Sequence, residues 1–215
     1  DHRDLHSFPT RRSSDLEINE IDDKLLDIMK NNKIMANHLH LPLQTGNDKI
    51  LKLMNRRYDT KFFYDKITKI REVRPDIAIT TDVIVGFPYE TDEDFNETKE
   101  FIKKVNFSGL HVFPYSKRSG TKAYDMPQVK DSIKKERTLD LIALSNELTL
   151  NYENKFLNKD VEVIFEEKYL DKYMVGHSSN YLRVIVPYDE KNLKQCKLVH
   201  IDEISNEGIF GHVLS

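Results

Sequence analysis

Polar residues that could bind a ligand occur in three apolar stretches of the chain. In the central stretch, Ala78–Pro88, the carboxylate of Asp82 stands within a β-branched run. Burial of a carboxylate is costly unless the group is paired or bound to a ligand. We therefore favour a role for Asp82 in contacting a ligand, or in holding a residue that does, over a purely structural hydrogen bond. Gly86, near the end of this stretch, allows a ligand to come close to the backbone.

The stretch upstream, Asn37–Gly46, alternates polar residues with leucine. Alternation with a period of two is typical of a strand and places His38, His40 and Gln44 on one face. In a parallel barrel the leucines should face the outer helices and the polar set the interior. This second stretch therefore predicts a polar interior beside Asp82.

The third stretch, Gly109–Ser116, leads into the polar loop Tyr115–Ala123. This loop suits contact with phosphate or ribose, and it equally suits a plain surface loop. Arg56 and Arg57 follow a short predicted helix over Asp48–Met54 and are open to the same two interpretations, an anion-binding role or solvated surface.

The elements that must position these residues alternate between strand and helix. Helical spacing of apolar residues, with capping residues at the helix starts, predicts helices over Asp22–Lys30, Thr60–Val73, Thr91–Val105 and Val129–Leu157. Strands and helices in this order form a parallel sheet with right-handed crossovers. The sequence therefore predicts an α/β fold with a site at the carboxyl ends of the strands.

After the last of these helices the pattern becomes all-β. Five short strands are predicted, over Val161–Phe165, Tyr173–His177, Tyr181–Val186, Lys197–Ile204 and Gly208–Leu214. Small closed β-barrels of this kind often bind oligonucleotides through aromatic and basic side chains, which Tyr181 and Arg183 supply. The charge balance opposes this interpretation, because residues 155–215 contain eight Lys or Arg against ten Asp or Glu.

Composition limits the possible classes of protein. The 215 residues are 39% hydrophobic and carry a net charge of -3, which gives no general attraction to nucleic acid. Cys196 is the single cysteine, so this chain cannot form a disulfide within itself or build a site from several thiolates. No apolar run approaches the roughly 20 residues of a membrane span, and a cytoplasmic location is expected.

The first residues do not fit the rest of the chain. His6–Leu16 has no hydrophobic periodicity and resembles one reading frame of a sequencing adapter. We therefore interpret residues 1–16 as a non-native leader and exclude them from the fold.

Several motifs together resemble those of a known family. In chain order they are His38–Gly46, Leu53–Tyr58, Thr81–Thr91 and Gly120–Thr121. They resemble the C-terminal half of the radical S-adenosylmethionine (radical SAM) methylthiotransferases, and the final β-rich segment resembles their TRAM domain, a tRNA-binding β-barrel. The resemblance implies part of a TIM-type α/β barrel, the C-terminal half of a radical SAM domain, over residues 17–153 and a TRAM barrel over residues 154–215.

The resemblance also implies an activity. Of three branches in this family, Phe107–Arg118 is most similar to the one that modifies threonylcarbamoyladenosine in tRNA; the others act on isopentenyladenosine in tRNA and on a ribosomal-protein aspartate. A 4Fe-4S cluster would cleave S-adenosylmethionine reductively, and the deoxyadenosyl radical would take hydrogen from C2 of the adenine next to the anticodon. A second cluster would supply sulfur and another S-adenosylmethionine the methyl group. The implied partners are tRNA, a reductant and a sulfur source.

Site residues are implied by their positions in the motifs. The expected contacts of S-adenosylmethionine are Gln44, Thr45, Asp82, Ile84, Gly86 and Phe87. The expected contacts of the substrate tRNA are Arg57, Phe113, Tyr115 and Arg118 near the active site, and Tyr181 and Arg183 on the β-barrel. The family chemistry requires no general acid or base from these residues, and no metal ligand is expected among them.

The chain departs from the family in one respect: it lacks the CxxxCxxC motif and the further cysteines that hold two 4Fe-4S clusters. We therefore expect a fragment that is inactive by itself. The alternatives are the isopentenyladenosine branch, a stand-alone RNA-binding module without catalysis, and a phosphate-binding TIM barrel such as an aldolase or isomerase. The last of these would require a catalytic Lys or Glu at a strand end and leaves the β-domain unexplained.

Overall fold

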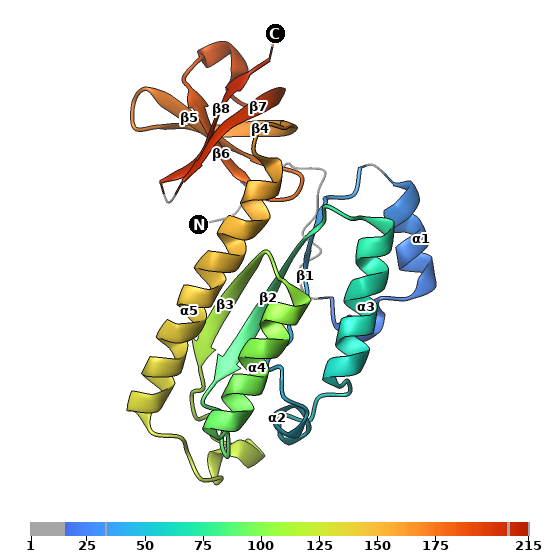
Figure 1. The fold of residues 1–215 in the computed structure, drawn as a ribbon, viewed down its shortest axis with the longest axis vertical. Helices are drawn as coiled ribbons and strands as arrows, with labels where there is room; N and C mark the ends of the chain where they lie inside the picture. The colour runs from blue at the N-terminus through green and yellow to red at the C-terminus, as the bar shows by residue number, and fades with distance from the viewer. Residues whose placement is uncertain (1–15, 33, 206, 215) are drawn as a thin grey trace.

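The computed structural model describes residues 16–32, 34–205 and 207–214. The predicted leader, residues 1–16, lies almost wholly outside these ranges. The described residues form a parallel α/β part followed by an all-β barrel, joined by one long helix (Figure 1). No helix in the described ranges is long and apolar enough to cross a membrane.

A three-stranded parallel sheet organises the first part. Its strands are β1 (His38–His40), β2 (Ala78–Val85) and β3 (Gly109–Pro114), in the order β1-β2-β3. The predicted strand at residues 37–46 is therefore shorter than expected, because after His40 the chain pairs with β2 again only at an isolated bridge between Gln44 and Val83.

Five α-helices accompany the strands. They are α1 (Asp23–Asn31), α2 (Asp48–Leu53), α3 (Thr60–Val73), α4 (Asp92–Val105) and α5 (Asp131–Glu153). Side-chain caps fix several starts: Asp59 accepts from the backbone N–H of Phe62 at α3, and Thr91 and Asp94 form a capping box at α4. The predicted helix over residues 129–157 is present but shorter, and it ends in a 3-10 turn over Asn154–Phe156.

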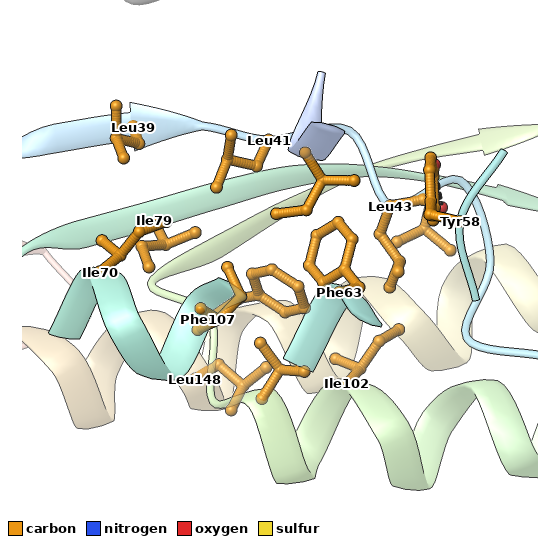
Figure 2. Close-up of a cluster of buried hydrophobic side chains, with 14 of the residues drawn as sticks. Leu39, Leu41, Leu43, Tyr58, Phe63, Ile70, Ile79, Ile102, Phe107 and Leu148 are labelled. Carbon is orange, nitrogen blue, oxygen red and sulfur yellow. Dashed lines mark hydrogen bonds between the residues drawn. The ribbon is translucent and has the colours of Figure 1, made fainter. Parts of the chain in front are cut away.

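The two faces of the sheet differ as the alternation predicts. Leu39, Leu41 and Leu43 are fully buried and point to the helices, together with Ile79 of β2 (Figure 2). Side chains of α3, α4 and α5 complete this core, among them Phe63, Ile70, Ile102 and Leu148. Phe107, between α4 and β3, also belongs to it. Burial of this apolar face is the main stabilising contribution to the first part of the chain.

The C-terminal part is a closed five-stranded barrel. Its strands are β4 (Asp160–Tyr169), β5 (Tyr173–Ser178), β6 (Arg183–Pro187), β7 (Cys196–Ser205) and β8 (Gly208–Val213), in the order β4-β5-β6-β8-β7. The five predicted strands are confirmed. The prediction that Tyr181 begins the third one is wrong: Tyr181 has a φ of 67°, which a strand residue does not adopt, and β6 begins two residues later.

The barrel contacts the amino ends of the parallel strands. The backbone N–H of Asn37 donates to the carbonyl of Ser179 at 2.9 Å. The hydroxyl of Tyr152, near the end of α5, donates to the carbonyl of Asp76 at 2.7 Å and accepts from Asn180 at 3.0 Å. Hydrogen bonds from both the long helix and the sheet therefore hold the β5–β6 turn.

Candidate cofactor-binding site

The inner face of the sheet carries a cluster of polar side chains. The register pairs His40 with Thr80 and Asp82 with His111, so alternate residues of three strands share this face. His40 Nε2 lies 3.3 Å from a carboxylate oxygen of Asp82, and the rings of His40 and His111 are 5.6 Å apart. The side chain of Asp82 is 29% exposed, so it is open to a ligand. The sheet therefore presents a carboxylate between two imidazoles.

Thr80 links two of the histidines. Its hydroxyl oxygen lies 2.9 Å from His38 Nε2 and 3.0 Å from His40 Nδ1. Burial, with His40 and His111 nearby, lowers the pKa of His38 to about 4, so this ring is neutral at pH 7. A neutral His38 and a hydroxyl that can donate one hydrogen bond and accept another hold the His40 ring in a fixed orientation.

Gln44 and Thr45 follow β1 but point differently. Gln44 has a φ of 70°, and its backbone exchanges hydrogen bonds with Asp82 and Ile84 at 2.8 Å. These bonds place Gln44 directly beside the strand that carries Asp82. Thr45 is fully buried, and its hydroxyl lies 3.0 Å from that of Thr98 in α4, so its side chain faces the helix layer. The Thr45 hydroxyl therefore does not reach the inner face, whereas Gln44 is tied to β2 through its backbone, at an isolated bridge to Val83.

The turn after β2 is held by a buried ion pair that sequence reasoning missed. Glu90 accepts a hydrogen bond from the N–H of Gly86 at 2.7 Å and pairs with Arg137 of α5 at 2.6 Å. Arg137 also reaches Asp92 at 2.7 Å. Burial raises the pKa of Glu90, while the Gly86 N–H and Arg137 act in the opposite direction. These contacts fix the turn that follows Val85.

Gly86 is required for two reasons. Its φ of +71° is a conformation that side chains rarely adopt, and a Cβ at this position would lie 2.3 Å from the Lys134 side chain. The space beside Gly86 is thus filled by Lys134. The expected approach of a ligand to Gly86 must come from its other side or from its backbone.

Aromatic residues surround the same turn. The ring of Phe87 packs edge-on against Tyr115 at 5.0 Å, and Lys134 Nζ lies 5.8 Å from the Tyr115 ring. Ile84 pairs with Phe113, which is 50% exposed. These residues form an apolar surface next to the polar cluster.

The predicted arginines of the active-site end lie in exposed loops. Arg57 follows α2 and Arg118 follows β3, and both are exposed. Within the described ranges, no side-chain contact holds either guanidinium in place.

Tyr181 and Arg183 lie at the other end of the strands. Tyr181 is 60% exposed, and its ring lies 4.9 Å from that of His38 and 5.3 Å from that of His177. The guanidinium of Arg183 lies 4.9 Å from the ring of Tyr169. The predicted residues therefore form two groups, one at the carboxyl ends of β1–β3 and one on the barrel at their amino ends.

Three residues at or beside the candidate site were not predicted from the sequence: Glu90, Arg137 and His111. The alternation that places Asp82 on the inner face of β2 also places His111 on the inner face of β3, so this signal was present. Arg137 lies on a helix without a clear apolar stripe, and nothing in its sequence neighbours indicates burial.

The motifs imply two cofactors, S-adenosylmethionine and iron-sulfur clusters. The residues of this chain fit the first and not the second. Asp82 offers acceptor atoms for hydroxyl groups, and Ile84 with Phe113 offers an apolar surface, as a nucleoside such as that of S-adenosylmethionine requires. Iron-sulfur clusters are held by several thiolates, and the single cysteine, Cys196, is exposed on the barrel. Its thiol pKa is raised by partial burial and by Glu162. The residues of this chain therefore do not fit an iron-sulfur cluster.

Comparison with known proteins shows which proteins this chain resembles. A family model described as "Radical SAM superfamily" matches residues 8–102. The threonylcarbamoyladenosine tRNA methylthiotransferase MtaB of Bacillus subtilis (strain 168) is 40% identical over 211 residues, which are 94% of this chain and 47% of that protein. The tRNA-2-methylthio-N(6)-dimethylallyladenosine synthase of Thermoanaerobacter sp. (strain X514) is 47% identical over 148 residues, 68% of this chain and 31% of that protein.

A solved structure supports the fold. Coproporphyrinogen III oxidase (HemN) from Escherichia coli, a radical SAM enzyme, aligns with a TM-score of 0.53 and 15% identity over 88% of this chain and 45% of that one. The chain spans about half the length, or less, of these two curated relatives. From these matches, the chain is similar to the radical SAM superfamily over residues 8–102 and, over most of its length, to tRNA methylthiotransferases.

Proposed function

We propose that this chain is part of a radical SAM tRNA methylthiotransferase that adds a methylthio group to C2 of N6-threonylcarbamoyladenosine next to the anticodon. One observation carries the proposal: 40% identity, over 94% of the chain, with a relative named for that reaction. On this proposal the parallel sheet is part of a TIM-type barrel within residues 17–153, residues 154–215 are a TRAM domain, and the protein works in the cytoplasm on tRNA.

The inner face of the sheet would hold S-adenosylmethionine, which supplies the radical and the methyl group when bound. Asp82 is placed to accept hydrogen bonds from ribose hydroxyls, because its carboxylate is part-exposed. Gln44 lies beside it, and Ile84 offers an apolar contact for the adenine. Gly86 and Phe87 would act through the turn that Glu90 and Arg137 hold. Thr45 would support the site from the helix layer.

The 4Fe-4S clusters of the proposed enzyme would need ligands from outside this chain, since the chain has one cysteine. We therefore propose that these 215 residues alone do not carry out the reaction. A reductant and a sulfur source would act together with the cluster-bearing part.

The tRNA would contact both groups of predicted residues. The modified base would enter at the carboxyl ends of β1–β3. The residues on or near this side are Phe113, Tyr115, Arg57 and Arg118. On the barrel, Arg183 lies over the Tyr169 ring, and similar pairs join Lys172 to Tyr173 and Lys168 to Tyr188. Exposed aromatic and cationic groups of this kind bind single-stranded nucleic acid by stacking and charge. Tyr181 would add an exposed ring at the junction.

The test is binding of the purified chain to three forms of one tRNA, measured by fluorescence anisotropy at several salt concentrations. The forms carry threonylcarbamoyladenosine, isopentenyladenosine or plain adenosine beside the anticodon. We expect the tightest binding to the first, weakening with salt as cationic contacts are screened. The variant Arg183→Ala should bind more weakly, whereas Lys103→Ala, which removes the same charge from α4, should not change the affinity.

The other outcomes decide between the alternatives. Tighter binding to the isopentenyl form would identify the other tRNA branch, which the 47% identical relative also suggests. Equal binding to all three forms would indicate an RNA-binding module that does not read the modified base. Absence of binding at low salt would refute a tRNA-contacting role for this part of the enzyme.

A further inference from the structure

One side-chain cluster on the inner face has the composition of a metal site. His40, Asp82 and His111 each offer one ligand atom, and these atoms all lie within 4.8 Å of one another. Each residue comes from a different one of the three adjacent parallel strands. Because the strands are packed against the helix core on their other face, the three Cα positions are fixed relative to one another.

The distances are close to those that a bound ion requires. Ligand atoms arranged tetrahedrally at about 2.1 Å from Zn²⁺ lie about 3.4 Å apart. His40 Nε2 and the Asp82 oxygen already meet this spacing at 3.3 Å. His111 is exposed, so a change of its side-chain torsions can bring its ring nitrogen the remaining distance without disturbing the core.

Thr80 supplies the outer support that metal-binding histidines usually have. Its hydroxyl contacts His40 Nδ1 at 3.0 Å and so directs the Nε2 atom toward Asp82. A hydrogen bond at the second ring nitrogen fixes both the tautomer and the ring orientation of such a ligand. If His40 and Asp82 formed only an ion pair with each other, His111 would have no role beside Asp82.

We propose that His40, Asp82 and His111 bind a divalent transition-metal ion of the zinc class, with Thr80 as a positioning residue. Two imidazole nitrogens and one carboxylate oxygen form a ligand set typical of such ions when other coordination positions stay open. In the part of the chain that the structure describes, no other group of three His, Cys, Asp or Glu residues has its ligand atoms within 4.8 Å of one another. The site is separate from any iron-sulfur cluster, because it contains no thiolate.

Other histidines provide matched controls. His200 pairs with Asp160 at 2.6 Å and His212 with Asp202 at 2.8 Å, both on the barrel surface. The two imidazole rings are 5.5 Å apart, but in the described ranges no three ligand atoms of these four residues lie within 4.8 Å of one another, so they should bind an ion only weakly. Cys196 is exposed and could bind zinc adventitiously, which makes Cys196→Ser a further control.

The experiment is calorimetric titration of the EDTA-treated 215-residue chain with Zn²⁺, without S-adenosylmethionine or tRNA. We expect one site whose affinity falls more than about 100-fold in Asp82→Asn and in His111→Gln, and about tenfold in Thr80→Val. His212→Gln and Cys196→Ser should bind Zn²⁺ as the unmodified chain does. Circular dichroism in EDTA checks folding, and His111→Gln, at an exposed position, carries the test if Asp82→Asn does not fold.

Three results would overturn the proposal: no zinc binding, unchanged binding in His111→Gln, or loss of binding in Cys196→Ser or His212→Gln, which would place the ion on the barrel. Failure of this test would leave the proposed enzyme function standing, because that function is tested separately by tRNA binding. Because Asp82 belongs to both proposed sites, the variant Gln44→Ala distinguishes them: it should weaken S-adenosylmethionine binding and leave zinc binding unchanged.

Discussion

The two faces of the parallel sheet are built from alternate residues of the same strands, yet they differ completely in character. Leu39 and Leu41 on the outer face are fully buried, whereas His40, between them in sequence, is part-exposed and contacts Asp82. Alternation within a strand thus lets one short segment contribute both to the core and to a binding surface. Substitutions on the inner face can therefore change the candidate site without removing side chains of the core.

The clearest exception to this separation lies at the carboxyl end of β2, where the buried Glu90–Arg137 pair fixes the turn beside the site. We expect Arg137→Ala to lower the free energy of unfolding by about 3–5 kcal/mol at pH 7, because Glu90 would remain buried without its cation. Urea unfolding measures this change.

The pH dependence identifies the cause of that loss. The Glu90 pKa is already raised by burial, and removal of Arg137 must raise it further. A raised carboxyl pKa means that the folded chain favours neutral Glu90. The loss of unfolding free energy in Arg137→Ala should therefore shrink as the pH falls from 7 to 5. Lys61→Ala, which breaks the exposed pair with Asp65, should cost far less than Arg137→Ala. A deficit independent of pH would show that lost packing, and not the unpaired carboxylate, is responsible.

A pair of substitutions tests the difference between the faces directly. Leu41→Ala should lower the free energy of unfolding by about 2–5 kcal/mol, because it leaves a cavity in the helix-facing core. His111→Ala, on the opposite face of the same sheet, should change it by no more than about 0.5 kcal/mol because the side chain is exposed. Both values come from urea unfolding without added metal. Equal losses in the two variants would contradict the division of roles between the faces.

A smaller effect than those of Arg137→Ala and Leu41→Ala is expected at the junction between the two parts of the molecule. Tyr152→Phe removes the hydroxyl that bonds Asp76 and Asn180, and we expect a loss of about 1–2 kcal/mol. Burial raises the pKa of Tyr152 to about 12. The folded chain therefore favours neutral Tyr152, and this group's contribution to stability should be lost as the pH rises from 10 toward 12.

Ultraviolet titration of tyrosinate measures that shift. Tyr58, whose pKa is also raised to about 12 by burial, is the internal comparison, since it lies in the core of the first part. The Tyr152→Phe variant should lose one of the two tyrosines that titrate near pH 12 and retain Tyr58. An unchanged titration curve would mean that Tyr152 is not held at the junction in solution.

Much of the local structure could be predicted from residue patterns. The helix at residues 92–105 follows from its capping box, and the five barrel strands follow from β-branched runs separated by turns. The failures have local causes too. Tyr181 was assigned to a strand because β-propensity describes side-chain environment, and it cannot detect that the turn forces a positive φ at this residue.

Residue alternation alone predicts which positions face the core and which the interior, and hence that His40 and Asp82 share the inner face. Which of these side chains meet depends on the folded arrangement of the whole chain. The register between β2 and β3 sets His111 against Asp82, and the docking of α5 brings Arg137 to Glu90, 47 positions away. Periodicity depends on neighbours two to four residues apart, whereas these contacts depend on strand register and helix packing, which no local pattern encodes.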